Sequence, residues 1–301
     1  MTFLPGHGFR TVAGFRYDFI NFSNNNNFTY FTNGPNPADS GDRFDSAPQP
    51  KLSLIFGPWA KTEFYINGGL GFHTDDARGV NTTQDPLDGT RVERALPIAH
   101  TQGAEVGVRT TIIPNLQSTL TFWALRLDSE LVWEGDSGTT VPSTNPDLRK
   151  GVEWANYYTP TKWLTIDADF ATSTAHFLNH PAGGDYVPEA ARTVIAAGVT
   201  VHDVRGWSSS LRWRYFGPRY LTQDGSQLSP TTSLVYYRLS YKFNKTWSID
   251  GDIFNLFNAK VPDISYYYTS RLQGEPAEGV NGFLFHAAEP RTFRLALTAR
   301  F

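Results

Sequence analysis

The sequence has no cysteine and only one methionine among its 301 residues. Without cysteine, the chain cannot form a disulfide scaffold, a thiolate metal site or a cysteine nucleophile. Its 26 basic and 29 acidic residues nearly balance, so no positive excess favours a nucleic acid as a partner. No stretch approaches the roughly 18 apolar residues of a membrane-spanning helix, and the opening stretch up to Asp18 lacks the basic and apolar segments of a signal peptide. A membrane protein that crosses the bilayer with strands is still possible, because alternating strands have an ordinary mean hydropathy.

The sequence does contain apolar residues at every second position in many segments. From Val235 to Phe243 each odd-numbered residue is apolar, whereas Arg238 and Lys242 lie between them. The same alternation recurs in the segments 62–70, 164–170, 207–216, 247–254 and 291–301. A period of two is typical of β-strands with one apolar face. We therefore predict about twelve strands; the segment 116–133 changes face partway and is expected to contain a bulge or a second short strand.

The predicted connections alternate between short and long. The short ones, about four residues each, are 57–61, 113–116, 159–163, 203–206 and 244–247. The long ones are 23–48, 73–101, 136–149, 178–189, 217–232 and 258–290. Short turns at one end and long loops at the other are typical of a transmembrane β-barrel, with periplasmic turns and extracellular loops. The sequence therefore predicts an all-β fold: an antiparallel transmembrane β-barrel portion of about twelve strands.

Tryptophans and charges agree with this prediction. Trp59, Trp163, Trp207 and Trp247 lie in or beside short turns, where they would form an interfacial girdle or instead close the end of a soluble core. Charged residues alternate with the apolar ones, so an apolar face towards lipid implies a wet or polar-filled lumen. The main residues predicted to face the lumen are Arg212, Arg214, Arg238, Asp250, Asp252 and Arg294.

No motif indicates catalysis. Asp250 and Asp252 share one strand face at i and i+2, which is typical of a solvated wall rather than of acid–base chemistry. The histidines lack metal-ligand spacing, and neither a phosphate-binding loop nor a serine nucleophile elbow is present. We therefore predict that the protein is not an enzyme and has no cofactor, metal site or catalytic residue.

Three stretches resemble the C-terminal barrel portion of TonB-dependent outer-membrane receptors. They are "KTEFYINGGLGFHTDDARG" (61–79), "DIFNLFNAKVPD" (252–263) and "EPRTFRLALTARF" (289–301). The resemblance implies a place in the bacterial outer membrane, contact with its lipid, and uptake of a scarce large solute such as a siderophore, cobalamin or oligosaccharide. It also implies two partners in the intact parent, TonB and a plug domain held by the lumen charges. The terminal Phe301 would be the signal that the barrel assembly machinery reads.

The resemblance also implies features that this sequence does not show. Members of the family have about 22 strands, a plug domain, a signal peptide and a box contacted by TonB. We therefore expect residues 1–301 to be a single domain, the C-terminal part of a receptor barrel that is N-terminally truncated and not competent alone. In the last long loop, the extracellular ligand would meet Tyr266, Tyr267, Tyr268 and Arg271, unless these tyrosines pack across the barrel mouth.

Two other functions remain open. A complete, closed barrel of twelve strands would be a passive outer-membrane channel or a secretion pore. A soluble β-rich protein that binds carbohydrate would use the same alternation to build an aqueous sandwich. The first alternative predicts ionic conductance, and the second predicts folding in buffer without detergent.

Overall fold

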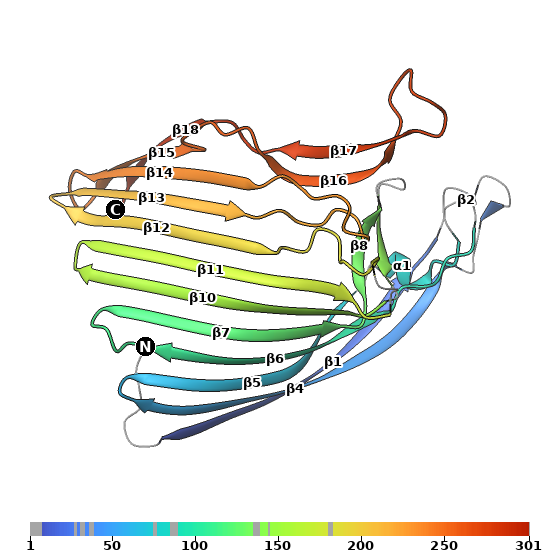
Figure 1. Ribbon diagram of the computed structural model, residues 1–301, viewed down its shortest axis with the longest axis horizontal. Helices are drawn as coiled ribbons and strands as arrows, with labels where there is room; N and C mark the ends of the chain where they lie inside the picture. The colour runs from blue at the N-terminus through green and yellow to red at the C-terminus, as the bar shows by residue number, and fades with distance from the viewer. Residues whose placement is uncertain are drawn as a thin grey trace.

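The computed structural model describes residues 8–26, 29–30, 34–35, 39–74, 77–84, 90–134, 139–143, 145–179 and 183–300. Its main element is a 12-stranded sheet in which each strand pairs antiparallel with its neighbours (Figure 1). The strands, in spatial order, are β1 (Phe9–Asn24), β4 (Gly41–Trp59), β5 (Thr62–Thr74), β6 (Ile98–Thr110), β7 (Leu116–Leu127), β10 (Asp147–Thr161), β11 (Leu164–Phe177), β12 (Thr193–Val204), β13 (Trp207–Phe216), β14 (Thr232–Lys242), β15 (Trp247–Phe254) and β18 (Thr292–Ala299). Spatial order follows chain order, and the predicted all-β class with about twelve antiparallel strands is confirmed.

Short hairpins occupy three of the long connections. They are β2 (Thr29–Tyr30) with β3 (Gly34–Pro35), β8 (Glu130–Glu134) with β9 (Thr139–Ser143), and β16 (Pro262–Ser270) with β17 (Val280–Ala287). The segment 116–133 thus contains β7 and the start of a second short strand, as expected. One helix, α1 (Ala77–Asn81), lies between β5 and β6. Within the described part of the chain, no helix has the length and apolar character that crossing a bilayer requires.

The connections are sorted as the sequence predicts. Five short turns lie at one end of the sheet, and the long connections with their hairpins lie at the other (Figure 1). Local chemistry explains the short turns: Ala60 and Lys61 have φ values of 46° and 62°, and Asn244 accepts backbone hydrogen bonds from Thr246 and Trp247 at 2.8 and 2.9 Å. Such positive φ values and side-chain-to-backbone bonds close tight reversals of the chain.

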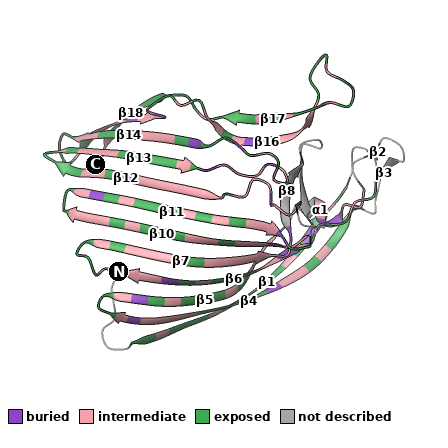
Figure 2. Cartoon of the chain, in the orientation of Figure 1, coloured by how far each residue is buried: buried purple, intermediate pink, exposed green. Residues whose placement is uncertain are grey.

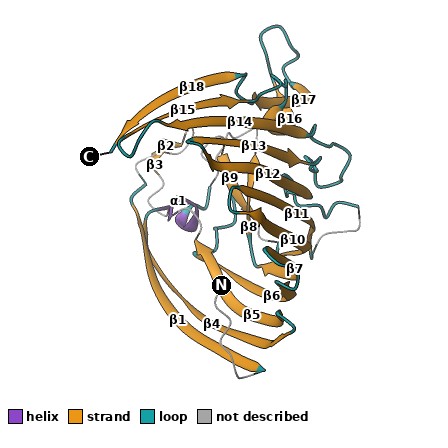
Figure 3. Ribbon diagram, turned by 90° about the vertical axis from the view of Figure 1, so that its left-hand side faces the viewer, coloured by secondary structure: helices purple, strands orange, loops and turns teal. Residues whose placement is uncertain are grey.

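The sheet is strongly curved and open (Figure 3). Its edges are β1 and β18, and no strand pairing joins them among the residues with a described position. Helix α1 lies inside the curve, where Val80 packs with Phe22 of β1 and Ala95. The side chain of Phe22 therefore marks the concave face of β1, and the strand register carries this face across the whole sheet.

The two faces differ in chemistry. Exposed and less exposed residues alternate along the strands (Figure 2). The convex face presents large apolar side chains to the outside; Phe293 and Leu295 of β18 are 70% and 74% exposed. The concave face carries most of the charged residues of the strands, including Arg294, which lies between these two residues in the chain. Because so large an exposed apolar surface is unfavourable in water, this sheet is built for an apolar surrounding.

Candidate functional site

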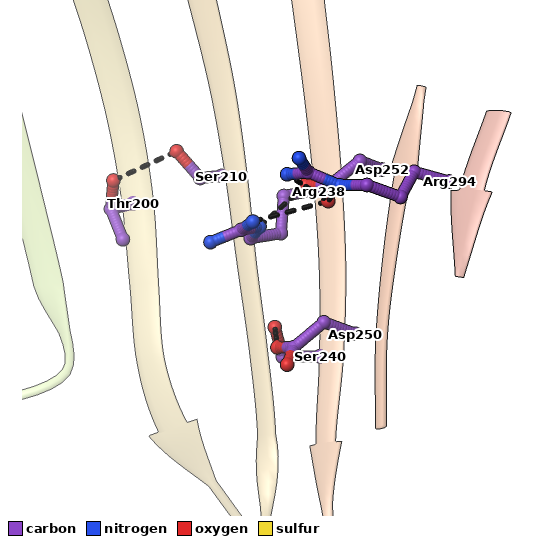
Figure 4. A network of polar contacts seen from close by, with 7 residues as sticks. All are labelled: Thr200, Ser210, Arg238, Ser240, Asp250, Asp252 and Arg294. Carbon is purple, nitrogen blue, oxygen red and sulfur yellow. Dashed lines mark hydrogen bonds and ion pairs between the residues drawn. The ribbon is translucent and has the colours of Figure 1, made fainter. Parts of the chain in front are cut away.

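The concave face contains a cluster of ion pairs across its last three strands. Arg238 of β14, Asp252 of β15 and Arg294 of β18 are direct cross-strand neighbours. Arg238 donates to Asp252 from Nε at 2.5 Å and from Nη2 at 3.1 Å, and Arg294 donates from Nε at 3.0 Å and from Nη2 at 2.9 Å (Figure 4). The Asp252 side chain is only 8% exposed. One carboxylate thus satisfies two guanidinium groups, and charge-assisted pairs of this kind are among the stronger hydrogen bonds.

A second ion pair crosses three strands because the middle one carries a glycine. Arg212 of β13 donates to both carboxylate oxygens of Asp167 on β11, at 3.2 and 2.9 Å. Gly198 of β12 lies between them in the register. A Cβ atom at this position would stand 2.8 Å from Asp167 Oδ1 and 3.0 Å from Arg212 Nη1. Gly198 therefore leaves the space that this ion pair occupies.

A third cluster lies near the short turns. Glu63 of β5 is fully buried and receives bonds from two arginines, Arg10 of β1 and Arg109 of β6. The Arg109 Nη2 to Glu63 Oε2 distance is 2.6 Å. Burial of a carboxylate is tolerated here because each of its oxygens has a cationic partner.

Five of the six main residues predicted to face the lumen have a hydrogen-bonded or ion-paired side-chain partner on the concave face. Arg238, Asp252 and Arg294 form one cluster, Arg212 pairs with Asp167, and Asp250 accepts a 2.5 Å bond from Ser240 (Figure 4). The sixth is Arg214, two positions after Arg212 and on the same face of β13. Within the described part of the chain, the side chain of Arg214 makes no ion pair or hydrogen bond.

Arg214 lines a cavity at the long-loop end of the concave face. The cavity has a volume of about 160 Å³ and lies over β13 and β14. Its lining also includes Phe216, Arg219, Thr232, Leu234, Tyr236 and Asp263. The Thr232 hydroxyl donates to the carbonyl of Pro262 at 2.6 Å and so holds the start of β16 against this end of β14.

Two long loops meet beside the cavity. Glu189, from the loop between β11 and β12, lies with Oε2 3.5 Å from Nη1 of Arg219, from the loop between β13 and β14. Glu189 adopts a left-handed backbone conformation with φ of 63°, and its amide donates to the Tyr220 carbonyl at 2.8 Å. Burial raises the pKa of the Glu189 carboxyl, and the charge of Arg219 only partly opposes this. The contact therefore keeps two ionisable groups poorly hydrated at the junction of the loops.

The same loops are joined by aromatic contacts. Tyr186 and Tyr220 have ring centroids 3.8 Å apart, and the guanidinium of Arg192 lies 4.6 Å from the centre of the Tyr220 ring. His176 at the end of β11 contacts Tyr186, with ring centroids 4.9 Å apart. Tilted aromatic and cation–π contacts of this kind fix loops that the sheet itself does not hold.

The predicted ligand residues of the last loop lie on the β16–β17 hairpin. Tyr266, Tyr267 and Tyr268 are successive residues of β16, so the middle ring points to the opposite face from the other two. Tyr267 packs edge-on against Phe283 of β17 at 5.1 Å. Burial, followed by the charge of Glu189, raises the pKa of the Tyr266 hydroxyl. These three tyrosines therefore do not form one continuous surface, and their role in ligand contact stays a prediction.

The other predicted residues have separate positions. Arg271 lies beyond β16 and donates from Nε to the Glu275 carbonyl at 3.3 Å. Phe301, predicted as the assembly signal, lies outside the described residues. Among the residues whose positions are described, no group of three or more His, Cys, Asp or Glu side chains could hold a metal ion.

Sequence reasoning did not identify Gly198 as the residue that makes room for an ion pair, or Glu189 and Arg219 as a contact between two loops. Gly198 interrupts the apolar segment 194–201, and a glycine inside a strand is a signal for close approach of neighbouring groups. Glu189 and Arg219 lie in loops without periodicity, so no local pattern indicates that they meet.

Comparison with known proteins gives the family. The family model described as "TonB dependent receptor-like, beta-barrel" matches residues 2–256. No curated protein matches the chain. Similar solved structures include the ferric-catecholate import receptor Fiu from E. coli K12 in its closed form (TM-score 0.71, 15% identity), the copper transporter OprC (0.71, 16%) and the ferric yersiniabactin uptake receptor FyuA from Yersinia pestis (0.70, 15%). These matches cover 98%, 98% and 97% of this chain, which spans 43%, 46% and 43% of the three structures.

Proposed function

Because the chain belongs to the family of TonB-dependent receptor-like β-barrels, we propose that residues 1–301 form part of the wall of an outer-membrane receptor. The receptor would take up a scarce large solute in a TonB-dependent manner. The observation that carries this proposal is the division of one curved sheet into an apolar convex face and an ion-paired concave face. Iron chelates and copper are the cargo in the names of the similar structures, which favours a siderophore over cobalamin or an oligosaccharide.

The convex face would contact the lipid of the bacterial outer membrane after insertion by the barrel assembly machinery. Its exposed apolar side chains match a hydrocarbon environment, and four tryptophans are exposed beside the short turns: Trp59, Trp163, Trp207 and Trp247. Indole groups at one level are typical of the boundary between membrane and water. The short turns would therefore lie on the periplasmic side and the long loops outside the cell.

The concave face would line the lumen and adjoin a plug domain, which contacts TonB. A lumen that holds water or a polar plug suits the paired arginines and aspartates, because their hydrogen bonds are already made within the wall. The solute would approach from the long-loop end, where Tyr266, Tyr267, Tyr268 and Arg271 are the proposed contacts.

An uptake experiment tests the proposal. In the bacterium that encodes the chain, deletion of the gene should lower the uptake of one labelled solute among ferric siderophores, cobalamin and oligosaccharides. Deletion of tonB, or collapse of the proton gradient, should cause the same loss. Uptake that persists without TonB would contradict the proposal. Stable ohmic conductance of the chain in planar bilayers would instead support the passive channel, and folding in buffer without detergent would support the soluble alternative.

The orientation of the two faces can be tested separately. Because the chain lacks cysteine, single replacements on β18 give unique labelling sites. A fluorophore at Leu295→Cys, on the convex face, should be quenched by quenchers placed on lipid acyl chains. The same fluorophore at Ala296→Cys, one residue along the strand and on the concave face, should be quenched by iodide instead. Equal lipid quenching at both sites would refute the assignment of the faces.

A further inference from the structure

We propose that the cavity formed by Arg214, Arg219 and Tyr236 binds an oxyanion group of the incoming solute: a carboxylate, a phenolate or a phosphate. The inference deepens the proposed function, and it rests on that function only for the identity of the molecule that carries the oxyanion.

The first argument is the contrast among the predicted lumen-facing arginines. Arg212, Arg238 and Arg294 each donate two hydrogen bonds to a carboxylate of the wall. Arg214 has the same strand face but no such partner among the described residues. A guanidinium is always charged and presents a fork of donors that matches the two oxygens of a carboxylate or phosphate. Arg214 therefore has its full donor capacity available to an occupant of the cavity.

The second argument comes from Arg219, which also lines the cavity. Its side chain is 16% exposed, and its contact to Glu189 is long, at 3.5 Å. Its buried Nε atom has no hydrogen-bond partner among the described residues. A buried, unsatisfied donor costs free energy, so the contacts that Arg219 makes within the described residues leave part of its donor capacity unused. Arg219 is thus a second cationic donor whose bonding is incomplete.

The size of the cavity and its other walls limit what can enter. Its volume of about 160 Å³ is well above the roughly 10–15 Å³ that one water molecule needs, so a group of several heavy atoms fits. Leu234 and Phe216 provide apolar contact, and the Tyr236 side chain adds an aromatic wall. One carboxylate, Asp263, also lines the cavity; it is 70% exposed and lies 3.9 Å from His286. Glu189 already opposes the charge of Arg219 and Asp263 is solvated, so the guanidinium of Arg214, which has no ion pair among the described residues, is what makes the cavity favour an anion.

Binding of benzoate and of inorganic phosphate to the full chain tests the proposal. The chain is folded in detergent micelles, and its β-structure is checked by circular dichroism. Benzoate binding is followed by saturation transfer from the protein to the ligand protons. Phosphate is tested by its ability to displace benzoate. We expect both anions to bind the wild-type chain.

Matched variants locate the site. Arg214→Gln should weaken benzoate binding at least tenfold, and Arg214→Lys, which keeps the charge but not the fork, should weaken it less. Arg212→Gln removes the same charge from the same face of the same strand, two residues away, and should leave binding within twofold of wild type. Circular dichroism spectra equal to wild type ensure that loss of binding is not loss of folding.

Two results would overturn the proposal. One is the absence of benzoate and phosphate binding to the wild-type chain. This result is expected if the partner of Arg214 is a carboxylate of another protein segment, such as a plug domain, and not a solute. The other is equal weakening by Arg214→Gln and Arg212→Gln, which would indicate a general effect of net charge. The outcome is independent of the uptake experiment: anion binding without TonB-dependent uptake would contradict only the proposed function, and uptake without anion binding would contradict only the cavity's role.

Discussion

Replacement of Asp252 by asparagine should measurably destabilise the sheet, because arginines of two neighbouring strands pair with its carboxylate. Asp252 is the shared acceptor of Arg238 and Arg294, and three of the four contacts end on its Oδ2 atom. Asparagine keeps the shape of the side chain but removes the negative charge and replaces one oxygen with a donor. If the amide nitrogen takes the place of Oδ2, three hydrogen bonds are lost, and the two guanidinium groups then face each other without a counter-charge.

The magnitude follows from the exposure of the three side chains. Hydrogen bonds to charged groups contribute roughly 1.5–3 kcal/mol each. The Arg238 and Arg294 side chains are 49% and 58% exposed, so both regain water when their partner is lost. The loss is therefore smaller than the roughly 3–5 kcal/mol observed when a fully buried ion pair is broken. We expect the free energy of unfolding to fall by about 2–3 kcal/mol.

Urea unfolding in detergent micelles, followed by tryptophan fluorescence, measures this change. The midpoint should fall while the slope stays constant, because the buried surface is unchanged. Asp250→Asn is the matched control: it lies two residues away on the same face and accepts one bond from Ser240, which the asparagine oxygen preserves. We expect a change below about 0.5 kcal/mol for this control. A loss for Asp252→Asn that is no larger than the loss for Asp250→Asn would refute the reasoning.

Three further predictions concern a glycine, the convex face and a loop. Gly198→Ala should break the Arg212–Asp167 ion pair and lower the free energy of unfolding by about 1–2 kcal/mol in the same assay. The control is Gly251→Ala, whose Cβ would find its nearest neighbour at 3.8 Å and which should be nearly neutral. Equal effects of the two changes would contradict the role of Gly198. Leu211→Lys should reduce membrane association in lipid vesicle flotation, since lysine towards lipid costs about 2–4 kcal/mol near the midplane, and Ser210→Lys on the concave face should not. The raised pKa of Glu189 means that the protonated carboxyl favours the folded state. Its contribution to the free energy of unfolding is present below about pH 4 and is lost as the pH rises through the folded-state pKa. Glu189→Gln should remove this component of the pH dependence of urea unfolding, and identical pH profiles for wild type and variant would contradict the prediction.

The strands could be predicted from the sequence because their signal is local. Alternation of side chains is decided within each strand, and segments such as 234–243 show it clearly. The sorting of short and long connections also needs only residue counts between strands. The hairpin β16–β17 escaped prediction because its three consecutive tyrosines put aromatic residues on both faces and hide the period of two.

The partners of the charged residues could not be predicted, because they depend on strand register. Arg212 reaches Asp167 across 45 positions of the chain, and only the alignment of three strands brings them together. Glu189 and Arg219 meet through two loops whose paths no periodic pattern records. The sequence indicates that a residue belongs to the charged face, whereas the pairing depends on the long-range geometry of the sheet.

The pairing changes what the charged face can do. An arginine that already shares a carboxylate within the wall attracts a further anion weakly, because the nearby negative charge cancels most of its field. Arg212, Arg238 and Arg294 are in this state, so a plug domain or solute in the proposed lumen would meet arginines whose donor groups are already engaged within the wall. A lumen occupant could then move along this surface without breaking many ion pairs. Strong attraction would then be concentrated at the long-loop end, where Arg214 makes no ion pair among the described residues.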